Sequence, residues 1–155
     1  MLGFRLQPWR KSLNRRLIET EKFYLFDIGL ANYLARREPK QGTPEFGKSF
    51  EHYMLLELMA YKAYRNPELP IYYWRTSTGL EVDFILGDME VAVEIKASKR
   101  VHETDTKGLK SLNAEHTLNK SILVSLESEP KVLGGNIECM PWRLFLENLW
   151  GNSLI

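Results

Sequence analysis

The sequence has a single cysteine and no long apolar run. One thiol, Cys139, excludes an internal disulfide bond, so the chain is not a small disulfide-stabilised scaffold. Such usage is typical of a reducing compartment, and we expect a cytoplasmic location. No stretch approaches the roughly 18 apolar residues that span a bilayer, because Glu57 interrupts the richest run, at 53–61. We therefore predict a soluble protein with no membrane-spanning or export segment.

A strong net charge is also missing, but the charge that exists is unevenly distributed. The net charge is +1, whereas residues 1–22 hold six basic and two acidic side chains. A basic segment on a mildly acidic body suggests contact with phosphate groups, and the alternative is a solvated, partly frayed terminus. We expect residues 1–21 to form a basic arm and residues 22–155 to form one domain, since about 150 residues is typical of a domain.

Hydrophobic patterning and capping signals predict an α/β (α+β) fold. Asp27 and Thr43 stand where helix N-caps belong, and Pro44 suits a first helical turn. The predicted elements are a strand over 22–26, helices over 28–37 and 44–65, strands over 71–75, 80–87 and 91–98, a helix over 104–117, strands over 121–127 and 137–140, and a helix over 142–150. From residue 44 onward, this order is typical of a mixed central sheet flanked by helices.

The two strands on either side of residues 88–89 form a predicted hairpin that brings charged side chains together. A turn centred there places Asp83 opposite Glu94, and Glu81 opposite Lys96. The same register puts only apolar residues on the other face: Leu80, Val82, Phe84 and Leu86 on the first strand, with Val91, Val93, Ile95 and Ala97 on the second. The hairpin therefore predicts one apolar face and one charged face.

The opposed acids have two interpretations. Directly opposed like charges are unfavourable, so Asp83 against Glu94 suggests that a cation lies between them. Mg²⁺ prefers carboxylate oxygens and keeps several waters, and with Lys96 it would hold a water and a charged transition state together. The alternative is a solvated sheet face with an ion pair between Glu81 and Lys96, which contributes about 0–1 kcal/mol. Spacing alone leaves both interpretations open.

Glu51 is a second acid in an unusual setting. Its neighbours at helical spacing, Met54, Leu55 and Leu58, are apolar. A carboxylate in an apolar stripe costs free energy unless a partner offsets it. If the helix packs on the sheet, Glu51 reaches the acid pair and adds a metal contact. The alternative is an edge position from which the carboxylate reaches water.

These residues and four longer blocks resemble a known nuclease superfamily. Asp83, Glu94 and Lys96, with Glu51 on a preceding helix, follow the pattern of the PD-(D/E)XK nucleases. The four blocks are KFYLFDIGLANYL (22–34), FGKSFEHYMLLEL (46–58), IYYWRTSTGLEVDFIL (71–86) and VAVEIKAS (91–98). They resemble the C-terminal nuclease-like domain of unknown function attached to prokaryotic AAA-type ATPases.

The resemblance implies a restriction-endonuclease-like core and a set of site residues. Asp83 and Glu94 match the family's metal-binding acids, Lys96 its catalytic lysine and Glu51 its helix acid, so that Mg²⁺ or Mn²⁺ is the implied cofactor. Val82 stands where the superfamily name has Pro. In the family layout an ATPase module and a winged-helix module lie upstream, and residues 1–21 are then expected to be a remnant of the winged-helix module.

Three classes of function follow from these expectations. The first is a Mg²⁺-dependent nuclease that hydrolyses DNA. The second is a non-catalytic module that binds nucleic acid or protein and regulates the ATPase, and a plain interaction domain with acids that do no chemistry is a third reading. The expected phosphate contacts are Arg75, Lys99 and Arg100, with Arg15 and Arg16 on the arm. The sequence leaves open DNA or RNA as substrate and a monomer or homodimer as the functional unit.

One further string, GTPEFGKS at 42–49, matches the phosphate-binding loop of nucleotide-binding proteins letter for letter. That loop requires a preceding buried strand and backbone N–H groups around the phosphates. No strand pattern precedes it, Pro44 removes one N–H group, and Glu45 adds a repelling charge. We therefore do not expect nucleotide binding at Lys48.

Overall fold

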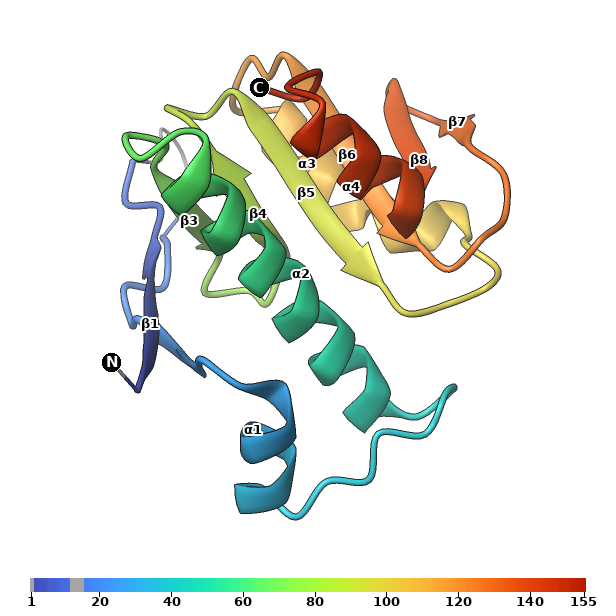
Figure 1. Ribbon diagram of the computed structural model, residues 1–155. Coiled ribbons are helices and arrows are strands. Elements are labelled where there is room, and N and C mark those ends of the chain that lie inside the picture. Colours follow the sequence, from blue (N-terminus) through green and yellow to red (C-terminus); the bar gives the residue numbers. More distant parts are fainter. Residues whose placement is uncertain (1, 12–15) are drawn as a thin grey trace.

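The computed structural model describes residues 2–11 and 16–155 and contains an eight-stranded mixed sheet with helices on both faces (Figure 1). The strands are β1 (Gly3–Pro8), β2 (Lys22–Leu25), β3 (Ile71–Arg75), β4 (Glu81–Leu86), β5 (Val91–Lys96), β6 (Lys120–Ser125), β7 (Lys131–Leu133) and β8 (Ile137–Pro141). The helices are α1 (Ile28–Leu34), α2 (Pro44–Tyr64), α3 (Lys107–Asn113) and α4 (Trp142–Trp150), and a 3-10 turn (Glu103–Thr106) precedes α3. The predicted fold class is confirmed.

The sheet has the order β2-β1-β3-β4-β5-β6-β8-β7. The pairs β1–β3, β5–β6 and β6–β8 are parallel, and the other neighbours are antiparallel. The connection from β5 to the parallel β6 passes through α3, as a crossover between parallel strands requires. This crossover places the start of α3 beside the end of β5, where the charged residues gather.

The two predicted helix caps are present. Thr43 Oγ1 accepts a hydrogen bond from the backbone N–H of Phe46 at 3.3 Å, and Asp27 Oδ1 accepts one from Leu30 at 2.6 Å. Each cap satisfies one of the backbone donors that a helix leaves free in its first turn. The Thr43 cap fixes the start of α2 and therefore the position of Glu51, which lies two turns further along the helix.

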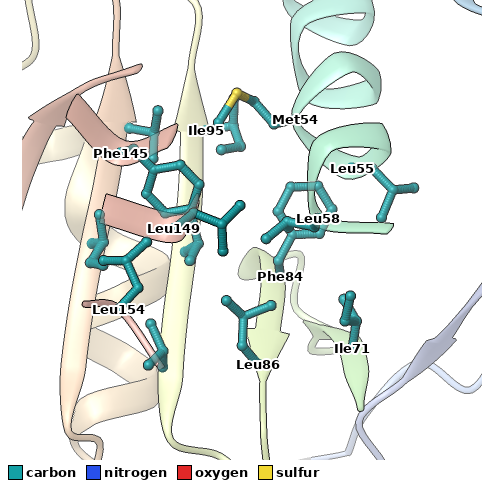
Figure 2. Close-up of a cluster of buried hydrophobic side chains, with 14 of the residues drawn as sticks. Met54, Leu55, Leu58, Ile71, Phe84, Leu86, Ile95, Phe145, Leu149 and Leu154 are labelled. Carbon is teal, nitrogen blue, oxygen red and sulfur yellow. The ribbon is translucent and has the colours of Figure 1, made fainter. Parts of the chain in front are cut away.

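Two apolar cores lie on opposite faces of the sheet. Helices α2 and α4 cover one face, and Figure 2 shows the side chains that they bury against β3, β4 and β5. Helix α3 covers the other face with Leu109 and Leu112, which pack with Ile85 and Ala92. The hairpin therefore has no solvated face in its middle, because both of its faces are part of a core.

The hairpin register is confirmed, but a bulge changes the predicted faces. Phe84 pairs with Val93 and Leu86 with Val91, as a turn centred on 88–89 requires. Towards β3 the register shifts by one residue, so that β4 has one more residue than β3 between the paired positions. Val82 consequently packs in the α3 core while Phe84 packs in the α2 core. Leu80 moves with Val82, so the single apolar face predicted for this strand is wrong.

The N-terminal residues are part of the sheet. Strand β1 lies between β2 and β3, within the segment expected to form a basic arm. Ile18 donates a backbone hydrogen bond to Arg75 at 2.8 Å, and the Tyr73 hydroxyl donates to the carbonyl of Thr20. Strands β1 and β7 are absent from the predicted elements, and α3 is shorter than predicted, ending before His116.

Helix α2 is the longest helix, at 21 residues, and it carries charged side chains along its length. Among the described residues, no helix combines the length with the apolarity that crossing a membrane requires.

Candidate functional site

A cleft of about 570 Å³ opens where the first turns of α2 meet the start of β4, the end of β5 and the start of α3. Its charged lining residues are Glu51, Glu81, Asp83, Glu94 and Asp105, with Lys48, Lys96 and Lys107. All four residues predicted for the metal site and its chemistry therefore face one cavity. Two of the lining residues, Asp105 and Lys107, come from the loop and helix after β5, for which the sequence pattern offered no site prediction.

Asp83 lies at the bulge, next to Phe84, where the regular pairing of β4 with β5 ends. Its Oδ2 accepts a hydrogen bond from the backbone N–H of Ile95 at 2.8 Å, so the carboxylate takes the place of a backbone acceptor. Burial raises the pKa of Asp83 well above its ordinary value, and the nearby carboxylates of Glu94 and Glu51 raise it further. The bulge thus turns a strand residue into a buried acid of the cleft.

Glu94 is the least satisfied acid of the cleft. Its Oε1 forms an ion pair with Lys96 Nζ at 3.2 Å. Its Oε2 is buried and has no hydrogen-bond partner among the described residues. Burial raises the pKa of Glu94 to about 7, against the opposing effect of Lys96. A buried oxygen with no partner is costly, and a cation bound beside it would offset that cost.

Lys96 is half-buried at the end of β5, and its ammonium faces the acids. Burial lowers the pKa of Lys96, but the carboxylates of Glu94 and Asp83 outweigh burial, so that the pKa is raised overall. Lys96 is therefore a permanent cation at neutral pH. The ion pair between Glu81 and Lys96 that the register suggested does not form among the described side chains. Glu81 instead pairs with Lys22 and, at 3.7 Å, with Arg75.

Glu51 reaches the acidic cleft from α2, as predicted, but one of its oxygens is already bound. Its Oε1 lies 3.4 Å from Lys22 Nζ and accepts a hydrogen bond from the Tyr24 hydroxyl at 2.5 Å. Both partners come from β2, which the sequence predicted as a strand without assigning it to the site. The available signal was the alternation of Lys22 and Tyr24, which places both side chains on one side of the strand.

The cleft fits a hard divalent cation in part. Asp83 and Glu94 supply carboxylate oxygens, which Mg²⁺ and Mn²⁺ prefer, and one Glu94 oxygen lacks a partner. In the part of the chain that is described, no three acid, histidine or cysteine side chains are close enough to form a ready-made metal cluster. Mg²⁺ is usually held by one or two carboxylates and keeps several waters, so two acids meet its needs. Glu51 would add a third ligand through Oε2, because its partners on β2 hold Oε1.

Four of the five residues expected to contact phosphate groups are described, and they lie outside the lining of the cleft. Arg75 pairs with Glu81 at the rim, and Lys99 and Arg100 are exposed in the loop after β5. Arg16 lines a separate hollow at the N-terminal segment. Arg15 lies outside the described residues. The assignment of these side chains to nucleic acid stays a prediction.

The segment 42–49 does not form a phosphate-binding loop in this fold. The residues before it form turns and loops, and α2 begins at Pro44 directly after the Thr43 cap. Lys48 is exposed and lines the acidic cleft from α2, while Lys107 lines it from α3. This segment therefore resembles a nucleotide-binding loop in sequence and not in structure.

Comparison with known proteins identifies a family without an assigned activity. Residues 46–145 match a family described as "Domain of unknown function (DUF4143)". An uncharacterized protein of Mycobacterium bovis and another of Mycobacterium tuberculosis are each 33% identical to the chain over 81 residues. The matched region is 50% of this chain and 18% of each relative. No solved structure matches the chain.

Proposed function

We propose that this chain, which belongs to the DUF4143 family, is a divalent-metal-dependent nuclease domain that hydrolyses phosphodiester bonds in DNA. The observation that carries this proposal is the buried Oε2 of Glu94, which has no hydrogen-bond partner among the described residues. Glu94 lines one cleft with Asp83 and Lys96. A structural role alone gives no reason to bury two like charges and leave one oxygen without a partner.

Each residue has a distinct role in the proposed reaction. Asp83 and Glu94 would hold Mg²⁺ or Mn²⁺, which supplies an acidified water and neutralises phosphate charge when bound. Hydrogen bonding from Ile95 fixes Asp83, so its free oxygen is held in one place. Lys96 presents a compact ammonium that orients the attacking water or offsets the charge that develops on the phosphate oxygens.

The state of Glu94 agrees with this role. With a pKa of about 7, its carboxyl is partly protonated at neutral pH in the absence of metal. A divalent cation requires the ionised form, so binding is coupled to proton release and weakens as the pH falls. Metal binding would also offset the repulsion between Asp83 and Glu94, which the folded chain otherwise tolerates at a cost.

Two further points support the proposal at the level of resemblance. The arrangement of Asp83, Glu94, Lys96 and Glu51 in one cleft is the arrangement expected of a PD-(D/E)XK nuclease. The relatives are much longer than the matched region, which is compatible with an upstream module such as the ATPase of the family layout. We propose this partner on resemblance alone, since fold does not determine function.

A second function is favoured by the state of Glu51. Because Lys22 and Tyr24 hold Oε1 of this carboxylate, Glu51 is less available to a metal ion than a carboxylate without these partners. The domain would then bind nucleic acid or a protein partner without cleaving it and would regulate an attached ATPase. This function predicts salt-sensitive DNA binding that survives Asp83→Asn and Lys96→Ala.

Cleavage of plasmid and branched DNA with Mg²⁺ or Mn²⁺ tests the proposed function. We expect cleavage that EDTA abolishes and that falls by about 10²–10³-fold in Lys96→Ala. Lys110→Ala is the matched control, because Lys110 is a lysine outside the cleft that pairs with Glu103. An inactive wild type, or equal activity in Lys96→Ala and wild type, would contradict the proposal.

A further inference from the structure

Lys22, on strand β2, is a cation that pairs with two acids of the cleft. Its Nζ lies 3.4 Å from Glu51 Oε1 and forms a closer ion pair with Glu81. The same ammonium lies 4.9 Å from the centre of the Tyr73 ring. Its side chain is 24% exposed, so most of it is shielded from water. Two acids of the cleft therefore have a protein cation as their immediate partner.

Strand β2 holds Glu51 through a second group. The Tyr24 hydroxyl donates to the same Oε1 of Glu51 that faces Lys22. Lys22 and Tyr24 are two residues apart on a strand, so their side chains lie on the same side of it. Both donors act on one carboxylate oxygen, but only Lys22 brings a charge.

The balance of charge in the cleft shows what Lys22 does. Four carboxyl groups converge here, those of Glu51, Glu81, Asp83 and Glu94, and their repulsion contributes to the raised pKa values of the last two. The protein cations in contact with them are Lys22, Lys96 and Arg75. Lys48 and Lys107 also line the cleft, but they form no ion pair with these four acids among the described residues. In the part of the chain that is described, Lys22 is the one cation that pairs with two of the acids.

We propose that Lys22 is an internal counter-cation that stabilises the metal-free cleft and competes electrostatically with the divalent metal ion. The proposal rests on the metal site of the proposed function and adds a positioning residue that sets its affinity. An ammonium beside Glu51 and Glu81 repels an incoming divalent cation and keeps Glu51 on β2. Lys22 lies outside residues 46–145, so the region that matches the family does not include this element of the site.

The proposal makes two opposite predictions for the removal of this charge. In Lys22→Gln the acids lose a counter-cation, so the metal-free protein is less stable than wild type. The same loss makes the cleft more negative, so the variant binds the metal more tightly, on the order of tenfold. Gln keeps a hydrogen-bond donor near Glu51 and Glu81, so the charge is the main change. A purely structural lysine would lower stability without raising metal affinity.

Isothermal titration with MnCl₂, in the absence of nucleic acid, tests this prediction on the full chain. The variants are Lys22→Gln, Tyr24→Phe and Lys40→Gln. Tyr24→Phe removes the other donor to Glu51 Oε1 without changing the charge, and we expect the affinity to change by less than about threefold. Lys40→Gln is the matched control, because Lys40 forms an exposed ion pair with Glu38, and its affinity should equal that of wild type.

The outcomes separate this proposal from the proposed function. Tighter Mn²⁺ binding in Lys22→Gln alone supports it. Equal or weaker binding in Lys22→Gln than in wild type overturns it and leaves the metal site standing. No Mn²⁺ binding by any variant, wild type included, overturns both. If Lys22→Gln folds only with Mn²⁺ present, the midpoint of Mn²⁺-induced folding replaces the Kd, and a midpoint above the wild-type Kd overturns the proposal.

Discussion

The two ends of the β4–β5 hairpin bury side chains of opposite character. Near the turn, Phe84 pairs with Val93 and Leu86 with Val91, and all four side chains are buried in one apolar core. At the other end, the same strands bury Asp83 and Glu94, with one oxygen unpartnered. Burial of apolar groups stabilises the fold, whereas burial of two like charges opposes it. Under the proposed function, the acidic end serves the chemistry and the apolar end supports it.

The bulge in β4 is the physical boundary between the two ends. On the turn side of the bulge, β4 pairs regularly with β5. Beyond it, Asp83 accepts a hydrogen bond from Ile95 through its side chain, and Val82 packs on the opposite face from Phe84. A bulge at the edge of an acid cluster can re-aim a side chain without interrupting the sheet.

The largest expected effect comes from the apolar end. Phe84→Ala removes a fully buried ring and leaves a cavity, so we expect a loss of about 3–5 kcal/mol in the free energy of unfolding. Urea denaturation followed by circular dichroism measures it. Phe23→Ala is the control, because Phe23 is 60% exposed and its loss should change stability by less than about 0.5 kcal/mol. A small effect of Phe84→Ala would show that the apolar end does not support the hairpin.

The acidic end is expected to respond in the opposite direction. Glu94→Gln replaces a strained carboxylate with a neutral group of the same shape, so in EDTA at pH 8 the variant should gain about 1–3 kcal/mol. The same change should abolish metal-dependent cleavage. A variant that is less stable than wild type under these conditions would show that the buried carboxylate is not a cost to the fold.

The pH dependence of stability sharpens this contrast. The pKa of Glu94 in the folded protein is about 7, above its ordinary value of 4.5. Between pH 4.5 and pH 7 the folded protein therefore holds a proton on Glu94 that the unfolded chain has released. Without metal, stability should therefore rise by about 1–2 kcal/mol as the pH falls from 8 to 5. Thermal melts in EDTA across this range test it, and the rise should shrink in Glu94→Gln. Stability that falls over this range in wild type would contradict the raised pKa.

The smallest expected effect is that of an exposed ion pair. Lys110 Nζ lies 2.6 Å from Glu103 Oε2, closer than Lys96 lies to Glu94, but both side chains are largely exposed. Solvent screens this pair, so Lys110→Met should leave the melting temperature unchanged within error. A clear loss would mean that distance, rather than burial, determines how strongly ion pairs act in this fold.

Local signals determine how much of the structure the sequence could predict. Thr43 and Asp27 are caps whose effect depends on residues three positions away, so both helix starts were correctly predicted. The hairpin register follows from turn length and was also correct. Strand β1 was missed because its own sequence has no strand pattern. Pairing with β2 and β3 stabilises it instead.

The acids of the site and Lys96 were predictable from the sequence, whereas the cations from other elements were not. Asp83, Glu94, Lys96 and Glu51 follow a recognisable spacing, and the cleft brings them together. Lys22 is 59 residues before Glu81 in the chain, and no spacing rule connects them. The bulge depends on the register of β3 against β4, which a single strand pattern does not reveal. Tertiary contacts therefore decide which lysine neutralises which acid.

The proposed function requires that Asp83 and Glu94 bind one divalent cation in the cleft beside Lys96. Crystals soaked with MnCl₂ and measured at the manganese absorption edge test it most directly. The account predicts one anomalous peak per chain, within about 2.5 Å of an oxygen of each acid. Absence of that peak after a soak at saturating MnCl₂, or a peak that contacts neither carboxylate, would contradict the proposed metal site.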